Sequence, residues 1–187
     1  MYNDTIRPWN LSASFDRPLL TTTDMILDFL NRLHRQRVDF VLVGGSAAVV
    51  HGVSLVTEDI DLCAPLDPLN LQRILEALGD LEPRWRMTPD RRPIPLDARQ
   101  LAGYRNLYLV TRLGQIDILS EISGIGGFEA VKGNSELADV GGVSCRILSV
   151  DGLIRSKRAL GRPKDLQAAI ELEAIRDRRP GGGNVNK

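Results

Sequence analysis

The sequence predicts an α+β domain in which helices pack on a β-sheet. Apolar residues within 25–33 recur at the spacing of one helix face. Residues 38–43 form a β-branched apolar run that is typical of a central buried strand. Residues 107–112 and 115–119 flank a Leu-Gly pair and are typical of a β-hairpin. A chain of 187 residues is long enough to bury one sizeable core.

The composition is that of an ordinary globular protein. Apolar residues make up 43% and charged residues 26%, and Lys+Arg and Asp+Glu both total 24. No global charge therefore favours nucleic acid or an anionic membrane. The exception is local: residues 84–112 contain seven arginines, with Trp85, Tyr104 and Tyr108 among them. This arginine-rich segment is either a solvated loop or a surface that contacts RNA through phosphates and base stacking.

Domain organisation and location follow from the ends of the chain and from the cysteines. We expect an N-terminal arm over 1–21, a single domain over 22–179 and a disordered tail over 180–187. No apolar run approaches the roughly 20 residues of a membrane helix, and no signal pattern is present, so we expect a cytoplasmic protein without a membrane partner. Cys63 and Cys145 are too few for a disulfide framework or a zinc site.

The expected helices and strands follow from helix-capping residues, from the spacing of apolar residues, and from prolines that interrupt regular structure. Thr22 or Thr23 is the expected cap of the first helix, and Asp67 with Pro68 starts a later one. Prolines forbid regular structure over most of 81–103. In chain order we expect a helix at 23–37, strand 38–43, helix 46–51, strand 55–64, a helix after Asp67, a loop at 81–103, hairpin strands 107–112 and 115–119, a connector at 120–127, a helical turn at 128–131, strand 143–148, and helices 149–160 and 164–178.

Two carboxylates stand out on the predicted strand 55–64. Asp59 and Asp61 are separated by one residue, so both side chains leave the same face of the strand. Neighbouring carboxylates repel each other unless a cation binds between them. Magnesium suits such a pair together with substrate phosphates, and two ions about 4 Å apart can clamp an in-line displacement. Taken alone, an Asp-x-Asp pair can also be a solvated strand edge.

Three residues before this strand can form a phosphate cradle. Gly44 and Gly45 lack side chains, so backbone can approach a triphosphate closely, and Ser46 begins a helix whose free N–H groups favour an anion. The Ser46 hydroxyl could donate to a phosphate oxygen. Asp117 lies between apolar residues on a later strand and is the candidate third carboxylate, acting as general base and metal ligand.

The segments GGSAAVVHG and TEDIDL, the later Asp117, and IRSKRALGRPKDL occur in this order. This pattern resembles the nucleotidyltransferase superfamily with the DNA polymerase β-like fold. More narrowly, it resembles the small bacterial group related to AbiEii-type toxins of toxin–antitoxin systems. The resemblance covers roughly residues 38–172, and the proline- and arginine-rich segment is unmatched.

The resemblance implies a sheet of antiparallel and mixed strands backed by helices, with C-terminal helices. It implies Asp59, Asp61 and Asp117 as metal ligands, with Gly45 and Ser46 on the nucleotide phosphates. Lys157 then meets a phosphate or the substrate, although it could equally be a solvated helix residue. Many relatives carry an arginine where this chain has Leu55, which weakens or reroutes any nucleotide contact made there. His51 is expected to be a structural histidine.

The predicted function is transfer of a nucleoside monophosphate from an NTP to an acceptor hydroxyl with Mg²⁺. The NTP would lie on Gly44, Gly45 and Ser46, and the acceptor would be RNA, such as a tRNA 3′ end, or a protein. A cognate toxin or antitoxin partner is expected if the narrower resemblance holds. Two alternatives remain: an antibiotic-like small molecule as acceptor, or a catalytically degenerate fold that serves as a binding partner or antitoxin.

Overall fold

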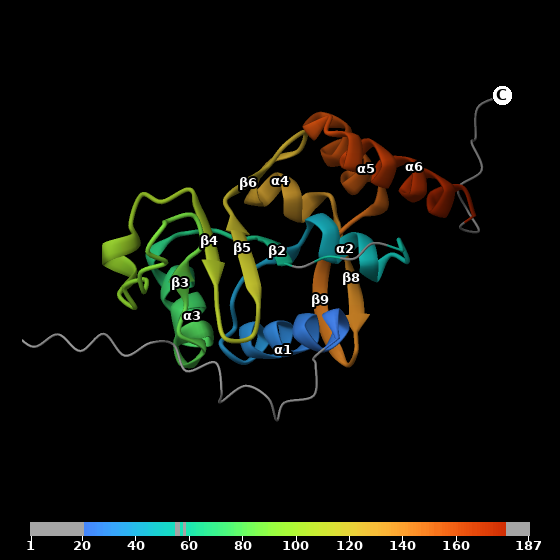
Figure 1. Cartoon of the computed structure of the whole chain (residues 1–187). Coiled ribbons are helices and arrows are strands. Elements are labelled where there is room, and N and C mark those ends of the chain that lie inside the picture. Colours follow the sequence, from blue (N-terminus) through green and yellow to red (C-terminus); the bar gives the residue numbers. More distant parts are fainter. Residues whose placement is uncertain (1–20, 55–56, 58, 179–187) are drawn as a thin grey trace, which may run out of the picture.

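The computed structural model describes residues 21–54, 57 and 59–178, which form a mixed seven-stranded sheet with helices around it (Figure 1). Residues 1–20 of the expected arm over 1–21, the expected tail over 180–187 and Leu55 lie outside the described residues. The sheet order is β3-β4-β5-β2-β1-β9-β8, and β6 and β7 form a separate small ribbon. The strands are β1 (Val41–Leu42), β2 (Asp59–Cys63), β3 (Arg84–Trp85), β4 (Asn106–Val110), β5 (Gln115–Leu119), β6 (Glu121–Ile122), β7 (Gly126–Gly127), β8 (Ser135–Val140) and β9 (Val143–Leu148).

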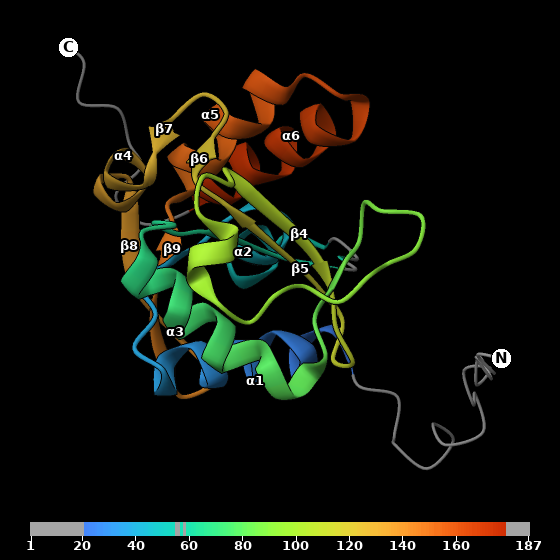
Figure 2. The same ribbon diagram turned by 90° about the vertical axis from the view of Figure 1, so that its left-hand side faces the viewer.

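Six α-helices and two 3-10 helices complete the described part of the chain. The α-helices are α1 (Thr22–Arg35), α2 (Gly44–Val50), α3 (Pro68–Leu78), α4 (Phe128–Gly133), α5 (Val150–Leu160) and α6 (Pro163–Arg178). The 3-10 helices are η2 (Gly79–Leu81) and η3 (Ala98–Leu101). In Figure 2, α1 and α3 lie together below the sheet, and α5 and α6 lie above it. The predicted α+β class and the C-terminal helices are confirmed.

The sheet is mixed, as the resemblance implied. Strand β1 pairs antiparallel with β2 and parallel with β9, while β2 pairs parallel with β5. The hairpin of β4 and β5 is antiparallel and turns at Leu113 and Gly114, as predicted. This order places β2 directly beside β5. The carboxylates of both strands consequently meet at the centre of the sheet.

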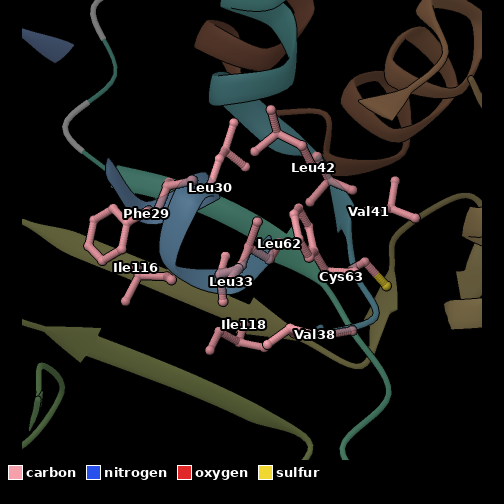
Figure 3. Packing of buried hydrophobic residues seen from close by; sticks show 14 of the residues in the cluster. Phe29, Leu30, Leu33, Val38, Val41, Leu42, Leu62, Cys63, Ile116 and Ile118 are labelled. Carbon is pink, nitrogen blue, oxygen red and sulfur yellow. The ribbon is translucent and has the colours of Figure 1, made fainter. Parts of the chain in front are cut away.

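The core lies between the sheet and α1. Phe29, Leu30 and Leu33 of α1 are fully buried, and they pack with Leu62 of β2 and with Ile116 and Ile118 of β5 (Figure 3). Alternate residues of β2 therefore face the core, and Asp59 and Asp61 leave the opposite face of the strand. The hydrophobic burial of β2 and β5 thus sets the direction in which their carboxylates point.

Several predicted boundaries are wrong at the first helix. Thr21, rather than Thr22 or Thr23, caps α1, and its side chain exchanges hydrogen bonds with Asp24 in a capping box. The helix ends at Arg35 instead of residue 37, because Arg37 adopts a left-handed conformation with φ of 54°. The Val38 N–H then donates to the Leu33 carbonyl and closes the helix end.

Other elements are shorter, longer or new. The predicted strand 38–43 is shortened to β1, because only Val41 and Leu42 pair with β2. The predicted strand 55–64 is shortened, among the described residues, to β2 at Asp59–Cys63. Helix α2 begins at Gly44 rather than at residue 46. Strand β8 was not predicted, and β3, β6 and β7 lie in segments expected to be loops. On α6, the apolar side chains of Leu166 and Ile170 are 45% and 59% exposed.

Candidate active site

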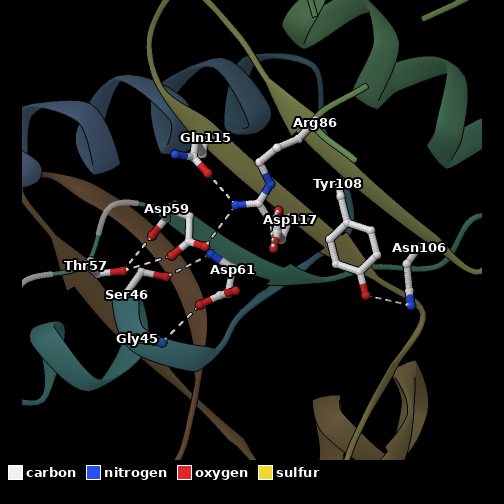
Figure 4. A network of polar contacts seen from close by, with 10 residues as sticks. All are labelled: Gly45, Ser46, Thr57, Asp59, Asp61, Arg86, Asn106, Tyr108, Gln115 and Asp117. Atoms are coloured by element: carbon white, nitrogen blue, oxygen red, sulfur yellow. Dashed lines mark hydrogen bonds and ion pairs between the residues drawn. The ribbon is translucent and has the colours of Figure 1, made fainter. Parts of the chain in front are cut away.

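Three carboxylates from two adjacent strands converge at the centre of the sheet. Asp61 of β2 lies directly opposite Asp117 of β5 in the parallel ladder, and Asp59 lies two residues earlier on the same face. One oxygen from each of Asp59, Asp61 and Asp117 lies within 4.8 Å of the others (Figure 4). The structure therefore brings together all three carboxylates that the sequence singled out.

An arginine that the sequence did not single out lies among these carboxylates. Arg86 Nη2 is 2.6 Å from Oδ1 and 2.5 Å from Oδ2 of Asp117, and its Nη1 is 3.5 Å from Asp59 Oδ2. Nη1 also donates to the Gln115 side chain, and the Arg86 Nε is buried with no hydrogen-bond partner among the described residues. The guanidinium thus neutralises part of the negative charge of the site.

The position of Arg86 follows from a short continuation of the sheet. Residue 86 comes directly after β3, and its N–H donates to the Tyr108 carbonyl of β4. Its guanidinium lies 5.9 Å from the centre of the Tyr108 ring. The only sequence signal was its place in the arginine-rich segment, where the surrounding prolines made a loop the better prediction.

Two of the three aromatic residues in that segment contact each other. Trp85 and Tyr104 stack on each other with their ring centres 5.1 Å apart. Tyr108 accepts a hydrogen bond from Asn106 and faces the pocket described below. Arg91 and Arg92 are exposed. Contact between these two arginines and RNA stays a prediction.

Gly44 and Gly45 lie in the first turn of α2, directly against Asp61. The Gly45 N–H donates to Asp61 Oδ2 over 3.0 Å. Gly44 has φ of +59°, and a Cβ on it would lie 2.1 Å from the same Asp61 oxygen. Only glycine fits here, because both the backbone conformation and the close approach exclude a side chain. The two glycines thus let the start of α2 approach the carboxylate of Asp61, and their contact with a phosphate stays a prediction.

Ser46 does not point its hydroxyl into open space. The residue is fully buried, and its Oγ donates to the Val43 carbonyl over 3.2 Å and accepts the Asp61 N–H over 3.1 Å. The expectation that this hydroxyl donates to a phosphate is therefore not met in this structure, because its donor is used within the protein. Ser46 instead ties the start of α2 to the backbone of β2.

Two neighbouring polar residues have structural roles. The Thr57 hydroxyl lies 2.9 Å from the Asp59 carbonyl and 3.2 Å from its side-chain Oδ1, which orients that carboxylate. His51 is buried, and its Nε2 lies 2.9 Å from the Leu148 carbonyl. The prediction that His51 is a structural histidine is confirmed.

The crowding of the carboxylates shows in their proton affinities. Burial, followed by the charge of Asp59, raises the pKa of Asp61 to about 6. Burial also raises the pKa of Asp117 to about 6, although the adjacent Arg86 guanidinium opposes this effect. Both shifts reflect the cost of holding several partly buried negative charges close together. A bound cation would relieve that cost.

A pocket of about 580 Å³ opens over the carboxylates, within the size range of small-molecule sites. Its walls come from the start of α2, from β2, β4 and β5, from the β6–β7 ribbon and from α5. Residues that matter for the chemistry line it: Gly44, Asp61, Tyr108, Asp117, Lys157 and Arg162. Gly44, two of the carboxylates and two cationic side chains therefore line one pocket.

Lys157 is held at the pocket wall by a buried carboxylate. Its Nζ lies 3.0 Å from Asp165 Oδ1, and Arg162 Nε lies 2.5 Å from Asp165 Oδ2. Asp165 is 1% exposed; burial alone would raise its pKa, but hydrogen bonds from Arg162 and Lys157 lower it below the usual value. The structure thus places Lys157 beside Asp61 and Asp117, while its contact with a phosphate stays a prediction.

The donor set fits a divalent cation such as Mg²⁺. Magnesium is usually held by carboxylate oxygens, and three of them converge here from the adjacent strands β2 and β5. Asp61 and Asp117 carry raised pKa values that a cation would reverse. Asp59, Asp61 and Asp117 are therefore the residues that could hold the metal.

Comparison with solved structures identifies the fold. No family model matches the sequence, and no curated protein is significantly similar to it. The antibiotic-resistance factor ANT(2'')-Ia matches with a TM-score of 0.53 and 19% identity, over 82% of this chain and 80% of that one. An antigenic nucleotidyltransferase-like protein from Paracoccidioides brasiliensis matches with a TM-score of 0.51 and 13% identity, over 84% of this chain and 78% of that one.

A second structure of ANT(2'')-Ia, in complex with adenylyl-2''-tobramycin, matches with a TM-score of 0.49 and 15% identity, over 83% of this chain and 94% of that one. The first two likenesses show that this chain shares its fold with these two proteins. The narrower resemblance to AbiEii-type proteins stays a prediction.

Within the described ranges, no helix is long and apolar enough to span a bilayer.

Proposed function

We propose that this chain transfers a nucleoside monophosphate from an NTP to an acceptor hydroxyl. The observation that carries the proposal is the pairing of Asp61 with Asp117 across β2 and β5, with Asp59 beside them and Gly44 packed against Asp61. Carboxylates so close together serve no evident packing purpose, and their mutual repulsion has to be offset. A site for a metal and a triphosphate accounts for both the carboxylates and the cradle.

Asp59, Asp61 and Asp117 would hold Mg²⁺. When bound, the cation supplies a Lewis acid that neutralises charge on phosphoryl oxygens. The triphosphate would lie in the pocket above Gly44, whose missing side chain lets a phosphate approach the backbone. Lys157, which is 13% exposed at the pocket wall, would place its ammonium against the phosphates.

Asp117 is the proposed general base. It lies on the pocket side of β5 and would accept the proton of the acceptor hydroxyl as that oxygen attacks the α-phosphorus. The bond from the α-phosphorus to the bridging oxygen breaks, and pyrophosphate leaves. Because Arg86 now occupies both oxygens of Asp117, the guanidinium has to release at least one of them before the proton can be accepted.

The acceptor would enter beside β6 and β7. This side of the pocket is lined by Glu121, Ser123 and Asn106. RNA and protein hydroxyls remain the acceptors proposed from the sequence, with a toxin–antitoxin role if the narrower resemblance holds. A small-molecule acceptor is the second candidate, because this side of the pocket carries an acidic residue, Glu121, and because one matched structure is an antibiotic-resistance factor.

A catalytically degenerate fold is the least supported interpretation. A site retired from catalysis gains nothing from keeping Asp59, Asp61 and Asp117 within 4.8 Å of one another. Nor does it need a glycine at position 44, where any side chain would strike Asp61. Leu55, where many relatives carry an arginine, lies outside the described residues.

A transfer assay tests the proposal. The protein would be incubated with each α-labelled NTP, Mg²⁺ and separated fractions of RNA, protein and small metabolites. We expect label in one fraction with the wild type and its loss with Asp117→Asn or with a chelator. Asp177→Asn, which changes an exposed aspartate on α6, is the matched control and should stay active. Absence of label in every fraction, together with absence of NTP binding by calorimetry, would refute the proposal.

A further inference from the structure

A second hollow, which we call the basic groove, lies at the other end of β1. The pocket over the carboxylates borders Val43 and Gly44, which follow β1, whereas the basic groove borders residues 38–40, which precede it. The basic groove measures about 840 Å³. The charged side chains in its lining are Arg35, Arg37, Arg73, Lys132, Arg146 and Asp39.

The charge of the basic groove is strongly one-sided. Five Lys and Arg residues line it against a single carboxylate, Asp39, whose Oδ2 lies 3.4 Å from Lys132. The chain as a whole is neutral, with 24 residues of each sign, so this excess is local. The cations come from four separate regions of the fold: the end of α1, α3, α4 and β9. Cations gathered from separate elements repel one another unless an anion binds among them.

Arg37 shows that a side chain is retained here at a conformational cost. It lies just after α1 in the left-handed region, with φ of 54°. Glycine is the usual residue at such a position, because it has no Cβ to clash. The same chain does use glycine after α2 and α5, at Gly52 with φ of +99° and Gly161 with φ of +68°. At position 37 the chain instead carries an exposed arginine, which adds a positive charge but strains the left-handed backbone.

Neighbouring contacts hold further cations at the same place. Arg73 Nη1 of α3 donates to the Arg37 carbonyl over 3.2 Å, which brings a second guanidinium to the end of α1. Arg146 Nη1 of β9 donates to Ser135 Oγ over 3.3 Å. Arg73, Arg146 and Lys132 are partly buried, so their positive charges lie in the walls of the basic groove.

We propose that the basic groove binds the phosphate backbone of duplex nucleic acid. A duplex offers regularly spaced phosphates that Lys and Arg can contact without reading bases. Single strands are usually held by aromatic side chains on which bases stack. Among the described lining residues, the aromatic rings are Phe40 and the imidazole of His34. Phe40 is only 8% exposed and therefore offers little surface for base stacking. The exposed apolar residue of the lining, Leu137, has no ring. This binding goes beyond the proposed transfer reaction and requires neither NTP nor metal.

The test measures binding of labelled duplexes by fluorescence anisotropy, in buffer without NTP or divalent cation. The probes are an RNA duplex and a DNA duplex of about 20 base pairs, titrated at several salt concentrations. The first variant is Arg37→Gly, which removes the cation and also relieves the left-handed backbone. Its melting temperature should equal or exceed that of the wild type, so a loss of binding cannot be attributed to unfolding.

We expect Arg37→Gly to weaken duplex binding roughly fivefold and to reduce the slope of log K against log salt by about 1. The double variant Arg37→Gly/Arg146→Ala should reduce the slope by about 2. The matched control is Arg91→Gly, because Arg91 is also an exposed left-handed arginine, with φ of 44°, but lies outside the basic groove. Arg91→Gly also tests the other interpretation, in which the arginine-rich segment contacts RNA. If the basic groove is the duplex site, this variant binds like the wild type.

Several outcomes would overturn the proposal. One is wild-type affinity and salt slope in both basic-groove variants. Another is weakened binding in Arg91→Gly alone, which would place the nucleic acid on the arginine-rich segment. A third is tighter binding of a polyglutamate peptide than of either duplex, with sensitivity to Arg37→Gly, which would make the partner an acidic polypeptide. Because the assay contains neither NTP nor metal, none of these results depends on whether the transfer reaction occurs.

Discussion

Arg86 and Asp117 form an ion pair in which a single guanidinium nitrogen, Nη2, contacts both carboxylate oxygens, at 2.6 Å and 2.5 Å. The guanidinium is 22% exposed and the carboxylate 10% exposed, so the pair is largely shielded from solvent. Arg86 also lies 3.5 Å from Asp59. A metal ion bound to the same carboxylates would have to compete with this guanidinium for Asp117.

Replacing Arg86 with alanine should therefore tighten metal binding. The variant removes a competing cation that is worth about 1–2 kcal/mol, which corresponds to an affinity gain of roughly tenfold. Without metal, Arg86→Ala should melt below the wild type, because three carboxylates then repel without a counter-ion. Calorimetric titration with MgCl2 or MnCl2 and melting curves with and without metal provide the two readouts.

Arg92→Ala is the control for this experiment, since Arg92 is exposed in the same segment. It should change neither metal affinity nor metal-free stability. Equal or weaker metal binding in Arg86→Ala would show that the arginine does not compete with the cation.

Gly44 should tolerate no side chain. In Gly44→Ala the new Cβ would lie 2.1 Å from Asp61 Oδ2, in addition to the left-handed strain of about 1–2 kcal/mol. We expect a total cost of roughly 3 kcal/mol and loss of NTP binding. Gly52→Ala is the matched control, because Gly52 has φ of +99° but a Cβ added there would meet no atom within 4 Å, and this variant should show the backbone cost alone.

The clash itself can be isolated by a double-mutant cycle in chemical unfolding. The pair Gly44→Ala and Asp61→Ala should cost less together than the sum of the single variants, because the second change removes the atom that the first one strikes. Additive costs would mean that the contact between these residues does not limit position 44.

Replacing Ser46 should lower the stability of the fold and the rate of transfer more than it lowers the affinity for NTP. Ser46→Ala deletes the hydroxyl that bridges the Val43 carbonyl and the Asp61 N–H, at a cost of about 1–2 kcal/mol. Transfer should fall because the backbone of Asp61 loses a support, while the Kd for NTP should stay within about twofold of wild type. Ser123→Ala, in the wall of the same pocket, is the control. A large loss of NTP affinity in Ser46→Ala would instead indicate a direct phosphate contact.

Asp165 should stabilise the junction of α5 and α6 in a pH-dependent way. Because Arg162 and Lys157 lower its pKa in the folded state, its contribution is complete above the unfolded pKa of about 4 and is lost as the pH falls through the lower folded value. At pH 7, Asp165→Asn should cost about 2 kcal/mol, since Asp165 is 1% exposed and both of its cationic partners lose their counter-charge.

Melting curves of wild type and Asp165→Asn should therefore converge as the pH is lowered below about 4. Asp177→Asn, on an exposed part of α6, should melt like the wild type throughout. A difference between Asp165→Asn and wild type that is constant with pH would contradict an ionised Asp165.

The carboxylate site was predictable because it follows from local periodicity. The alternation of apolar residues and aspartates in β2 and β5 fixed the faces of Asp59, Asp61 and Asp117, and the resemblance supplied the expectation that they converge. The last two helices were also predictable from local sequence. Ser149 caps α5, Gly161 ends it in a left-handed conformation, and Pro163 begins α6.

What escaped prediction depends on contacts between distant segments. Arg86 lies among prolines, and only its pairing with β4 brings it to Asp117. The Ser46 hydroxyl was expected to face a phosphate, but the approach of Asp61 buries it. Strand β8 contains Glu136 and Asp139 and lacks a clear alternating pattern, so its pairing with β9 defines it as a strand. Non-local pairing of this kind leaves little trace in local sequence.

The most direct test of the proposed reaction follows the two ends of the triphosphate separately. An acceptor-containing fraction would be incubated with Mg²⁺ and the same NTP, labelled at either the α- or the γ-phosphorus, using wild type and Asp117→Asn. We predict that α-label becomes attached to the acceptor while γ-label is released as pyrophosphate, and that both signals vanish in Asp117→Asn. Transfer of γ-label to the acceptor, or transfer of α-label that persists in Asp117→Asn, would contradict nucleotidyl transfer at this site.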